Sequence, residues 1–255
     1  MVNKIYPLLS NMIHPRNSAG PLFPDVPDVY TDSPIICYLI HAGEEWILVD
    51  TGACGETWSG KYHHKMTPVE PDNWDKLLAP FGLTPKDIKT IVNTHLHWDH
   101  CYNNDLFPNA KIYVQRKEVE FAINPVPSHY VYYEAFQIGM IPPWVASSGR
   151  FEIIEGELEI AEGVRLIPLP GHTPGFQGVL VTAGNGQQYL IAGDCVANLN
   201  NWYNRAFGQA VPSYIHVDLA VYYETLQRMT KMNAVILPGH DLRAFNEKVY
   251  PPEKA

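Results

Sequence analysis

The sequence predicts an α/β protein built as an αββα sandwich, in which two mixed β-sheets are covered by helices. Three observations predict this fold. Short apolar runs rich in β-branched residues recur along the 255 residues, and they fall into two groups that are each followed by a segment with helical periodicity. Residues that suit metal ions stand directly after several of these runs. Because no linker is visible, we expect one domain over residues 1–255.

The predicted strands are short runs bounded by turn residues. In the first group, a hairpin joins 35–43 to 45–52 through the turn sequence GEE, and the runs 90–95 and 110–115 follow. The second group contains another hairpin, marked by the turn signal TAGNGQ between its two middle runs. Its strands are expected at 164–170, 178–184, 188–194 and 234–240.

Helices are predicted between and after the strand groups, over 70–82, 115–124 and 217–232. Gly82 ends the first of them. The third is the most regular, since Asp218 lies near its start and apolar residues repeat at helical spacing: Leu219, Tyr222, Leu226 and Met229.

Composition and charge narrow the function classes. The chain is 46% hydrophobic and 18% charged, and it has neither an apolar run of the roughly 18 residues that a membrane helix needs nor a signal-peptide pattern. We therefore expect a soluble, cytoplasmic protein without a membrane partner. The net charge of −9 and the scattered Lys and Arg residues argue against a nucleic-acid partner. Four cysteines without CxxC spacing predict no disulfide in such a compartment.

The stretch HLHWDH at 95–100 carries the strongest chemical signal. Alternate residues of an extended chain share a face, so His95 and His97 can point the same way. A tight turn after the tryptophan would bring Asp99 and His100 to a neighbouring point. Burying these four groups together without a metal would leave several polar groups in need of partners. The stretch therefore predicts a metal site.

Three further residues follow apolar strands and a glycine or turn: His172 in PGHTPG, Asp194 in AGDC and His240 in PGHD. Each alone is more often a packed or turn residue, but together with HLHWDH they complete a set of seven candidates. Seven ligands are too many for one tetrahedral zinc and suit two divalent ions, bridged by one carboxylate and open to water. Imidazole and carboxylate without thiolate favour Zn, Mn, Fe or Co over Cu(I).

With these motifs the chain resembles the metallo-β-lactamase superfamily, whose fold is the αββα sandwich. Five ordered motifs carry the resemblance across essentially the whole chain: ILVDTG, THLHWDH, PGHTPG, AGD and PGH. Within the superfamily the chain is most similar to the acyl-homoserine lactone lactonases. The matching stretches are CYLI before ILVDTG, IYVQRKEVEFA, and FEIIEGELEIAEGVRLIPLPGHTPGFQ.

The resemblance implies a role for each candidate. His95, His97 and His172 would bind one ion. Asp99, His100 and His240 would bind the other, and Asp194 would bridge the two ions. A hydroxide between the ions would attack the substrate, and Asp99 would also orient it or shuttle its proton. Asp50, in LVDTG, would orient a ligand histidine, although from the residues alone a turn aspartate is equally expected.

The resemblance implies a dinuclear metal-dependent hydrolase that opens a lactone or related cyclic ester, as in quorum quenching. A glyoxalase II-like thioesterase, a phosphodiesterase, or another hydrolase of esters or cyclic amides would use the same metal core. A non-catalytic binding protein is a third reading, which the complete ligand set disfavours. The substrate would be a small lactone or ester, and the family favours a homodimer.

The sequence departs from the lactonases at Ala197, where they carry a tyrosine that contacts the lactone carbonyl. Tyr203 is a candidate to replace it. The segments 124–150 and 197–216, rich in Tyr, Trp, Pro and Asn, are expected to line the pocket. Two cysteines stand beside ligand candidates, Cys101 and Cys195, and we expect them to be packed and inert, with metal contact as the alternative.

Overall fold

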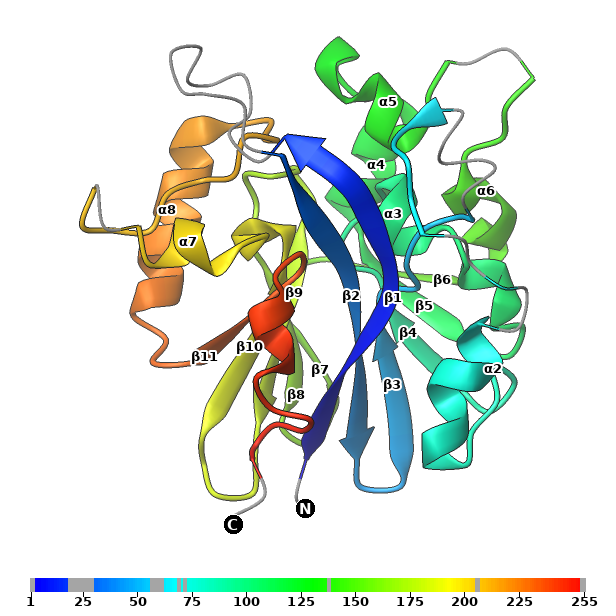
Figure 1. The fold of residues 1–255 in the computed structure, drawn as a ribbon, viewed down its shortest axis with the longest axis vertical. Helices are drawn as coiled ribbons and strands as arrows, with labels where there is room; N and C mark the ends of the chain where they lie inside the picture. Colours follow the sequence, from blue (N-terminus) through cyan, green and yellow to red (C-terminus); the bar gives the residue numbers. More distant parts are fainter. Residues whose placement is uncertain are drawn as a thin grey trace.

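The apolar runs form two mixed β-sheets that pack face to face, with helices on both outer faces (Figure 1). This arrangement confirms the predicted αββα sandwich. The structure is a computed structural model, and it describes residues 3–17, 30–55, 62–67, 70, 73–136, 139–204 and 207–252.

The first sheet, as far as the described residues go, has the order β1-β2-β3-β4-β5-β6. Its first three strands pair antiparallel and the others parallel. Because parallel strands end at the same edge, the residues that follow β3 and β4 lie side by side. The strands are β1 (Lys4–Asn17), β2 (Tyr30–Ala42), β3 (Glu45–Val49), β4 (Thr90–Val92), β5 (Lys111–Gln115) and β6 (Phe151–Ile154).

The second sheet has the order β11-β10-β9-β8-β7 within the described ranges. All its pairs are antiparallel except β10 with β11, which are parallel and therefore end together. The strands are β7 (Leu158–Ala161), β8 (Val164–Pro168), β9 (Gln177–Thr182), β10 (Gln188–Gly193) and β11 (Val235–Pro238).

The helices are mostly short. Seven of them are labelled α2 (Asn73–Leu78), α3 (Trp98–Cys101), α4 (Arg116–Ile123), α5 (Tyr130–Tyr133), α6 (Pro143–Ser147), α7 (Leu199–Trp202) and α8 (Leu219–Thr230). Single 3₁₀ turns lie at Ala79–Phe81, Asn104–Leu106, Pro127–His129, Ser148–Arg150, Asp194–Val196 and Leu242–Phe245. No helix in the described part of the chain is long and apolar enough to cross a membrane.

Burial explains the layers. Between the sheets, Ile40 and Val49 from the first sheet pack with Val181 and Ile191 from the second, and all four are at most 1% exposed. A separate cluster covers the outer face of the first sheet, where α2 contributes Trp74. On the opposite outer face, α8 buries three hydrophobic side chains: Tyr222, Leu226 and Met229. Burying each such side chain stabilises the fold by about 1.5–3 kcal/mol.

The regular helix α8 agrees with its prediction in all but one residue of the apolar stripe. Asp218 is its N-cap, and the side chain of Asp218 accepts a hydrogen bond from Val221 N at 3.0 Å. Leu219, however, is 48% exposed, and Thr225 is buried in the stripe instead. Leu219 occupies the first helical position, at the exposed end of the apolar stripe.

Three strands at the edges of the two sheets were not predicted. β1 contains Pro7 and lies at an edge of the first sheet, a position in which a missing backbone N–H is tolerated. β6 and β7 have no fully buried residue, so they lack the apolar run that marks a central strand. The predicted strand at 90–95 ends at Val92, which releases the following residues into the loop that carries HLHWDH.

Three predicted segments only partly coincide with the described residues. The helix predicted at 70–82 begins at Asn73 and closes through a 3₁₀ turn onto Gly82 in the left-handed conformation, while residues 71 and 72 lie outside the description. Within the segments 124–150 and 197–216, residues 137, 138, 205 and 206 also lie outside it.

Candidate metal centre

All seven predicted ligands lie together at one end of the sandwich, beyond the ends of four strands. HLHWDH follows β4, with its last residues in α3, and the other three candidates follow β8, β10 and β11. Each of the seven residues is at most 8% exposed. They are His95, His97, Asp99, His100, His172, Asp194 and His240.

The seven residues form three overlapping groups whose ligand atoms lie within 4.8 Å of one another. The first cluster is His95, His97 and His172. The second cluster is His95, His100 and Asp194, and the third cluster is Asp99, His100 and His240. Because the second cluster shares a residue with each of the others, the groups form one continuous centre with two ends.

Asp194 stands between these ends and presents one oxygen to each. Its Oδ2 lies 3.5 Å from Nε2 of His172, whereas its Oδ1 lies 3.3 Å from Nε2 of His100 and 2.9 Å from Nε2 of His240. Ligands held about 2.0–2.1 Å from a tetrahedral zinc lie about 3.3 Å from one another. The separations at Asp194 are close to this spacing on both sides.

Unpaired atoms provide an independent test of whether the residues fit metal ions. The Nε2 atoms of His95, His100 and His240, and Oδ1 of Asp194, are buried and make no hydrogen bond. The contacts of His100 and His240 with Asp194 would set nitrogen lone pairs against the carboxylate when the ring protons lie on Nδ1. Unpaired buried polar atoms are costly, and metal coordination would satisfy all of them. The residues therefore fit divalent ions at both ends of the centre.

Backbone carbonyls fix the orientation of two of the histidines. Nδ1 of His172 lies 2.8 Å from the carbonyl oxygen of Ile215, and Nδ1 of His240 lies 2.7 Å from that of Pro34. A carbonyl only accepts, so Nδ1 must be the donor in each pair. In the neutral ring this leaves the lone pair on Nε2, which faces the centre, as is usual for metal-binding histidines.

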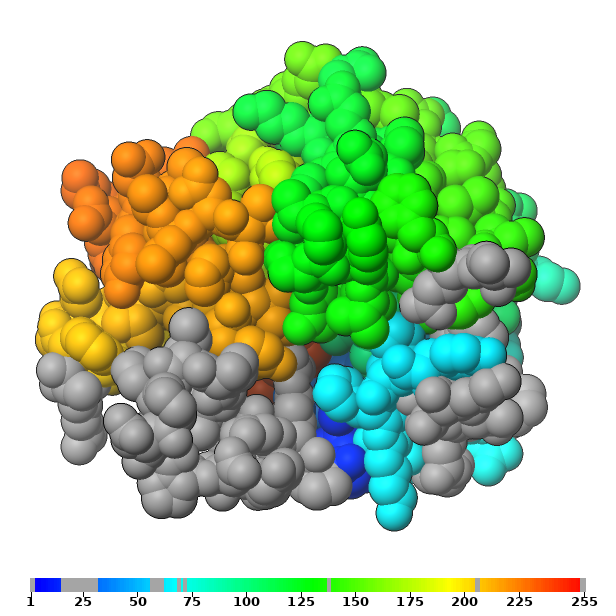
Figure 2. All heavy atoms as spheres, turned by 90° about the horizontal axis from the view of Figure 1, so that it is seen from above, coloured from blue at the N-terminus to red at the C-terminus, as the bar shows by residue number. Residues whose placement is uncertain are grey.

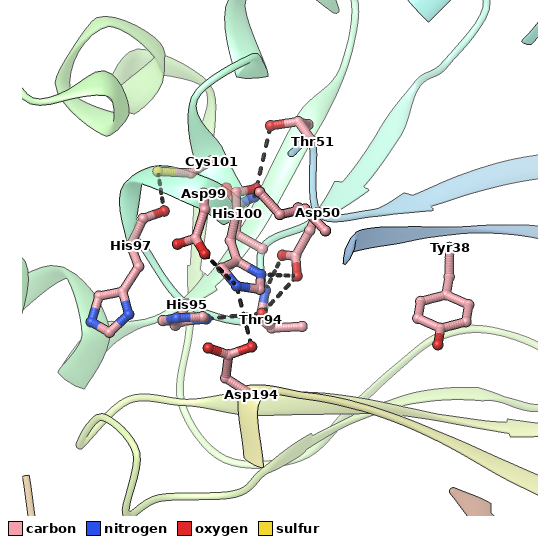
Figure 3. A network of polar contacts seen from close by, with 12 residues as sticks. Tyr38, Asp50, Thr51, Thr94, His95, His97, Asp99, His100, Cys101 and Asp194 are labelled. Atoms are coloured by element: carbon pink, nitrogen blue, oxygen red, sulfur yellow. Dashed lines mark hydrogen bonds and ion pairs between the residues drawn. The ribbon is translucent and has the colours of Figure 1, made fainter. Parts of the chain in front are cut away.

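Asp50 fixes two more histidines through the network in Figure 3. Its Oδ2 lies 2.8 Å from Nδ1 of His100 and also accepts a hydrogen bond from the Thr94 hydroxyl at 2.8 Å. Since the Thr94 proton is directed to Asp50, its oxygen is free to accept from Nδ1 of His95 at 3.0 Å. Asp50 sits just after β3 with φ of 60°, a left-handed conformation that Asp tolerates better than most residues.

The pKa shifts of the first-cluster histidines and of His100 have opposite directions. Burial lowers the pKa of His95 and of His97 well below the usual range, and it lowers the pKa of His172 to about 4. These rings are therefore neutral, which is the form that binds metals. Burial also acts to lower the pKa of His100, but the carboxylates of Asp194, Asp99 and Asp50 outweigh it and raise that pKa well above normal.

A narrow cleft opens onto the centre. Beside His97, Asp99 and Asp194, it is lined by Ile13, His64, Trp98, Tyr132 and Ile215. Figure 2 shows the hollow at this end of the molecule, between the green surface of α5 and the orange surface that precedes α8.

The residues beside the predicted ligands have contrasting environments. Tyr203 is 65% exposed and is not among the residues that line the cleft. Cys101 is buried, donates to the carbonyl of His97 at 3.3 Å, and has its pKa raised by burial, so it is a packed thiol. Burial likewise raises the pKa of Cys195. All four cysteines are free.

Three residues of the site were not predicted: Thr94, Glu118 and Tyr132. Thr94 sits between a strand and a motif and could have been suspected for its hydroxyl. Glu118 lies on the buried side of α4, where a carboxylate has no periodic signal of its own. Tyr132 belongs to an aromatic-rich stretch whose sequence does not reveal which ring faces the cleft.

An αββα sandwich with paired His/Asp clusters at one end of its sheets defines a class of layered α/β metalloprotein. The profile of the metallo-beta-lactamase superfamily matches residues 30–240, a span that contains all seven candidates. The chain belongs to the metallo-β-lactamase superfamily.

Individual relatives agree with this assignment. The chain is 30% identical to an N-acyl homoserine lactonase of a Bacillus species over 241 residues, 88% of each chain. It is 29% identical to the N-acyl homoserine lactonase AttM of Rhizobium radiobacter over 189 residues, 69% of this chain and 66% of the relative. A crystal structure of a quorum-quenching N-acyl homoserine lactone lactonase superposes with a TM-score of 0.75 at 27% identity, covering 99% of this chain and 98% of that one.

Proposed function

We propose that this protein is a dinuclear metal-dependent hydrolase that opens lactones or related cyclic esters. The observation that carries the proposal is Asp194, whose two oxygens face opposite ends of one buried His/Asp centre. The lactone class is supported by relatives named N-acyl homoserine lactonases, which match over most of this chain.

The proposed ligands are the seven residues of the centre. The first cluster would hold one ion, the third cluster would hold the other, and Asp194 would be shared. Two bound divalent ions, which we propose to be zinc, would lower the pKa of water toward neutrality and polarise the ester carbonyl. The neutral first-cluster histidines suit zinc, although Mn, Fe and Co accept the same donors.

Asp99 is the proposed proton carrier. It lines the cleft, and its Oδ2 lies 3.7 Å from Nε2 of His240 and 3.8 Å from Nε2 of His100. From this place its carboxylate would accept a proton from the attacking water and return it to the leaving alkoxide oxygen as the ring opens. Asp194 and Asp99 are thus the proposed catalytic carboxylates.

We propose that the segments 124–150 and 197–216 form the substrate walls. Tyr132 from the first segment and Ile215 from the second both line the cleft, which supports this role. Ala197 has no phenol to offer, and its backbone carbonyl accepts from His240 N at 2.8 Å. Tyr132 is therefore our candidate for the phenol that contacts the substrate carbonyl.

Three wider features remain proposals: one domain over residues 1–255, a cytoplasmic location and a homodimer. Four free, buried cysteines are consistent with a reducing compartment. Light scattering of the purified protein would measure the oligomeric state, and a single monomeric mass would remove the dimer from the proposal.

The test combines elemental analysis with a pH-indicator assay on one preparation, with and without chelator. The assay panel holds homoserine lactones, aromatic lactones, simple esters and thioesters. We expect two ions per chain and ring opening that chelator abolishes and added metal restores. Turnover of thioesters alone would transfer the function to the thioesterase reading, and a protein that binds no metal would remove the proposal.

A further inference from the structure

Glu118 is a fully buried carboxylate that the proposed reaction does not use. It lies in α4 and is 0% exposed. Its Oε1 accepts from Leu96 N at 2.9 Å and from the Tyr133 hydroxyl at 2.5 Å, and its Oε2 accepts from the Thr173 hydroxyl at 2.6 Å. The backbone N–H of Gly175 also donates to it.

Three of these four donors, Leu96, Thr173 and Gly175, belong to the segments that carry the first cluster. Leu96 lies between His95 and His97, and Thr173 directly follows His172. One carboxylate therefore ties together the two loops that supply all three histidines.

Two close contacts tighten the same arrangement. The ring of Tyr133 packs edge-on against the ring of His97, with centroids 4.7 Å apart. A Cβ at Gly175 would lie 2.0 Å from the backbone nitrogen of Glu118, so only glycine allows the His172 loop to approach α4 this closely.

Burying the carboxylate of Glu118 carries a desolvation cost. All four donors are neutral, and burial raises the pKa of Glu118 although the hydrogen bonds from Thr173 and Tyr133 oppose the rise. An apolar residue of similar size would fill the position without any desolvation cost. An apolar residue would, however, leave the N–H groups of Leu96 and Gly175 without this acceptor.

We propose that Glu118 is a positioning residue for the first cluster, which it holds by fixing the main chain of both loops. This inference rests on the proposed function, since the first cluster is assigned one of the two ions there. The third cluster is held by other contacts, among them those of Asp50 with His100 and of Pro34 with His240. Loss of the carboxylate should therefore affect the two ions unequally.

Glu118→Gln tests the proposal with little change in volume. The amide nitrogen is a donor, so in either orientation the variant turns an N–H toward one of the two loops. We would load wild type and variant with zinc and follow metal release to a chromogenic chelator in excess. We expect one ion to leave about 10- to 100-fold faster in the variant and the other to leave at the wild-type rate. The visible spectrum of the cobalt-substituted variant should change for one ion only.

A matched control separates positioning from general loosening. Tyr250→Phe removes a buried hydroxyl that donates to Ala244 O at 2.8 Å, in a part of the chain that does not touch the first cluster, and it should release both ions at wild-type rates. Thr173→Val removes one donor from Glu118, while Thr173→Ser keeps it. Release should be faster in the valine variant and near wild type in the serine variant, and this pair decides the question if Glu118→Gln does not fold.

The outcomes separate the two proposals. A wild type that binds two ions, with Glu118→Gln and Thr173→Val both releasing them at wild-type rates, overturns the positioning role and leaves the proposed function intact. Equal acceleration of both ions also overturns it, because a general loosening would produce that result. A wild type that binds no metal overturns the proposed function, and the positioning role with it.

Discussion

Two buried carboxylates support the centre, and they do so in different ways. Asp50 acts on the ligand rings, directly at His100 and through Thr94 at His95. Glu118 contacts no ligand ring through its hydrogen bonds and instead holds the loops around the first cluster. The comparison shows that a ligand can be positioned through its ring or through its backbone, and that only the first way leaves a short motif such as LVDTG in the sequence.

A change at Asp194, which faces both ends of the metal centre, should give the largest effect. Asp194→Asn keeps the shape but removes the charge that faces both ends, so we expect loss of both ions and a fall in turnover on the order of 10³-fold or more. Elemental analysis and the lactone assay measure the two losses on one sample. Retention of both ions at full turnover would contradict the bridging role.

The protonation contrast predicts how the metal-free protein responds to acid. The folded pKa of His172, about 4, lies below its unfolded value of about 6.5, so the unfolded state binds more protons between these pH values. Stability should fall as the pH drops through this window, by about 3 kcal/mol from His172 alone. His95 and His97 shift in the same direction, whereas Glu118 shifts in the opposite sense.

His100 does not change the pH dependence in this window. Its pKa is raised in the folded state, so its contribution to the stability is fully present below its pKa in the unfolded state. Urea unfolding of chelated protein at pH 6.5 and pH 4.5 measures the difference. The zinc-loaded protein provides the comparison, because coordination keeps the rings deprotonated and should flatten the dependence. A chelated protein that is equally stable at both pH values would show that its histidines are not held neutral.

Substitutions at Asp50 and Thr94 should have effects of intermediate size on metal binding, and they test how Asp50 positions the ligand rings. Asp50→Asn should weaken metal binding by about 10- to 100-fold at both ends, because His95 and His100 both depend on this carboxylate. Thr94→Val interrupts only the path to His95, so it should weaken mainly the ion of the first cluster. Metal competition titrations distinguish the two patterns, and identical profiles for both variants would contradict the relay through Thr94.

The smallest expected effect comes from Tyr133→Phe, which removes one of the four donors to Glu118. Losing one buried hydrogen bond typically costs about 0.5–1.5 kcal/mol of stability. Tyr250→Phe removes a comparable buried hydroxyl and should cost about the same in urea unfolding. Only Tyr133→Phe should also speed the release of an ion. Equal release rates in the two variants would show that Tyr133 does not help to position the site.

The sequence predicted the central strands and the seven candidates because both leave local signals. Val92 ends an apolar run. His95 and His97 follow it at alternate positions, a spacing that predicts a metal site. β6 could not be predicted, since its edge position demands little apolar burial. Glu118 could not be predicted either, because its role depends on loops more than 20 and 50 residues away meeting at one carboxylate.

The loop around His172 has a mechanical consequence. A Cβ at Gly171 would lie 2.5 Å from Cα of Tyr222 in α8, just as one at Gly175 would collide with α4. The loop is thus clasped between helices that cover opposite sheets of the sandwich. The proposed ion of the first cluster would bind His95 and His97, which follow β4, and His172, which follows β8, so it would join the two sheets. The concentration of free metal would then determine how much this ion stabilises the packing of the two sheets.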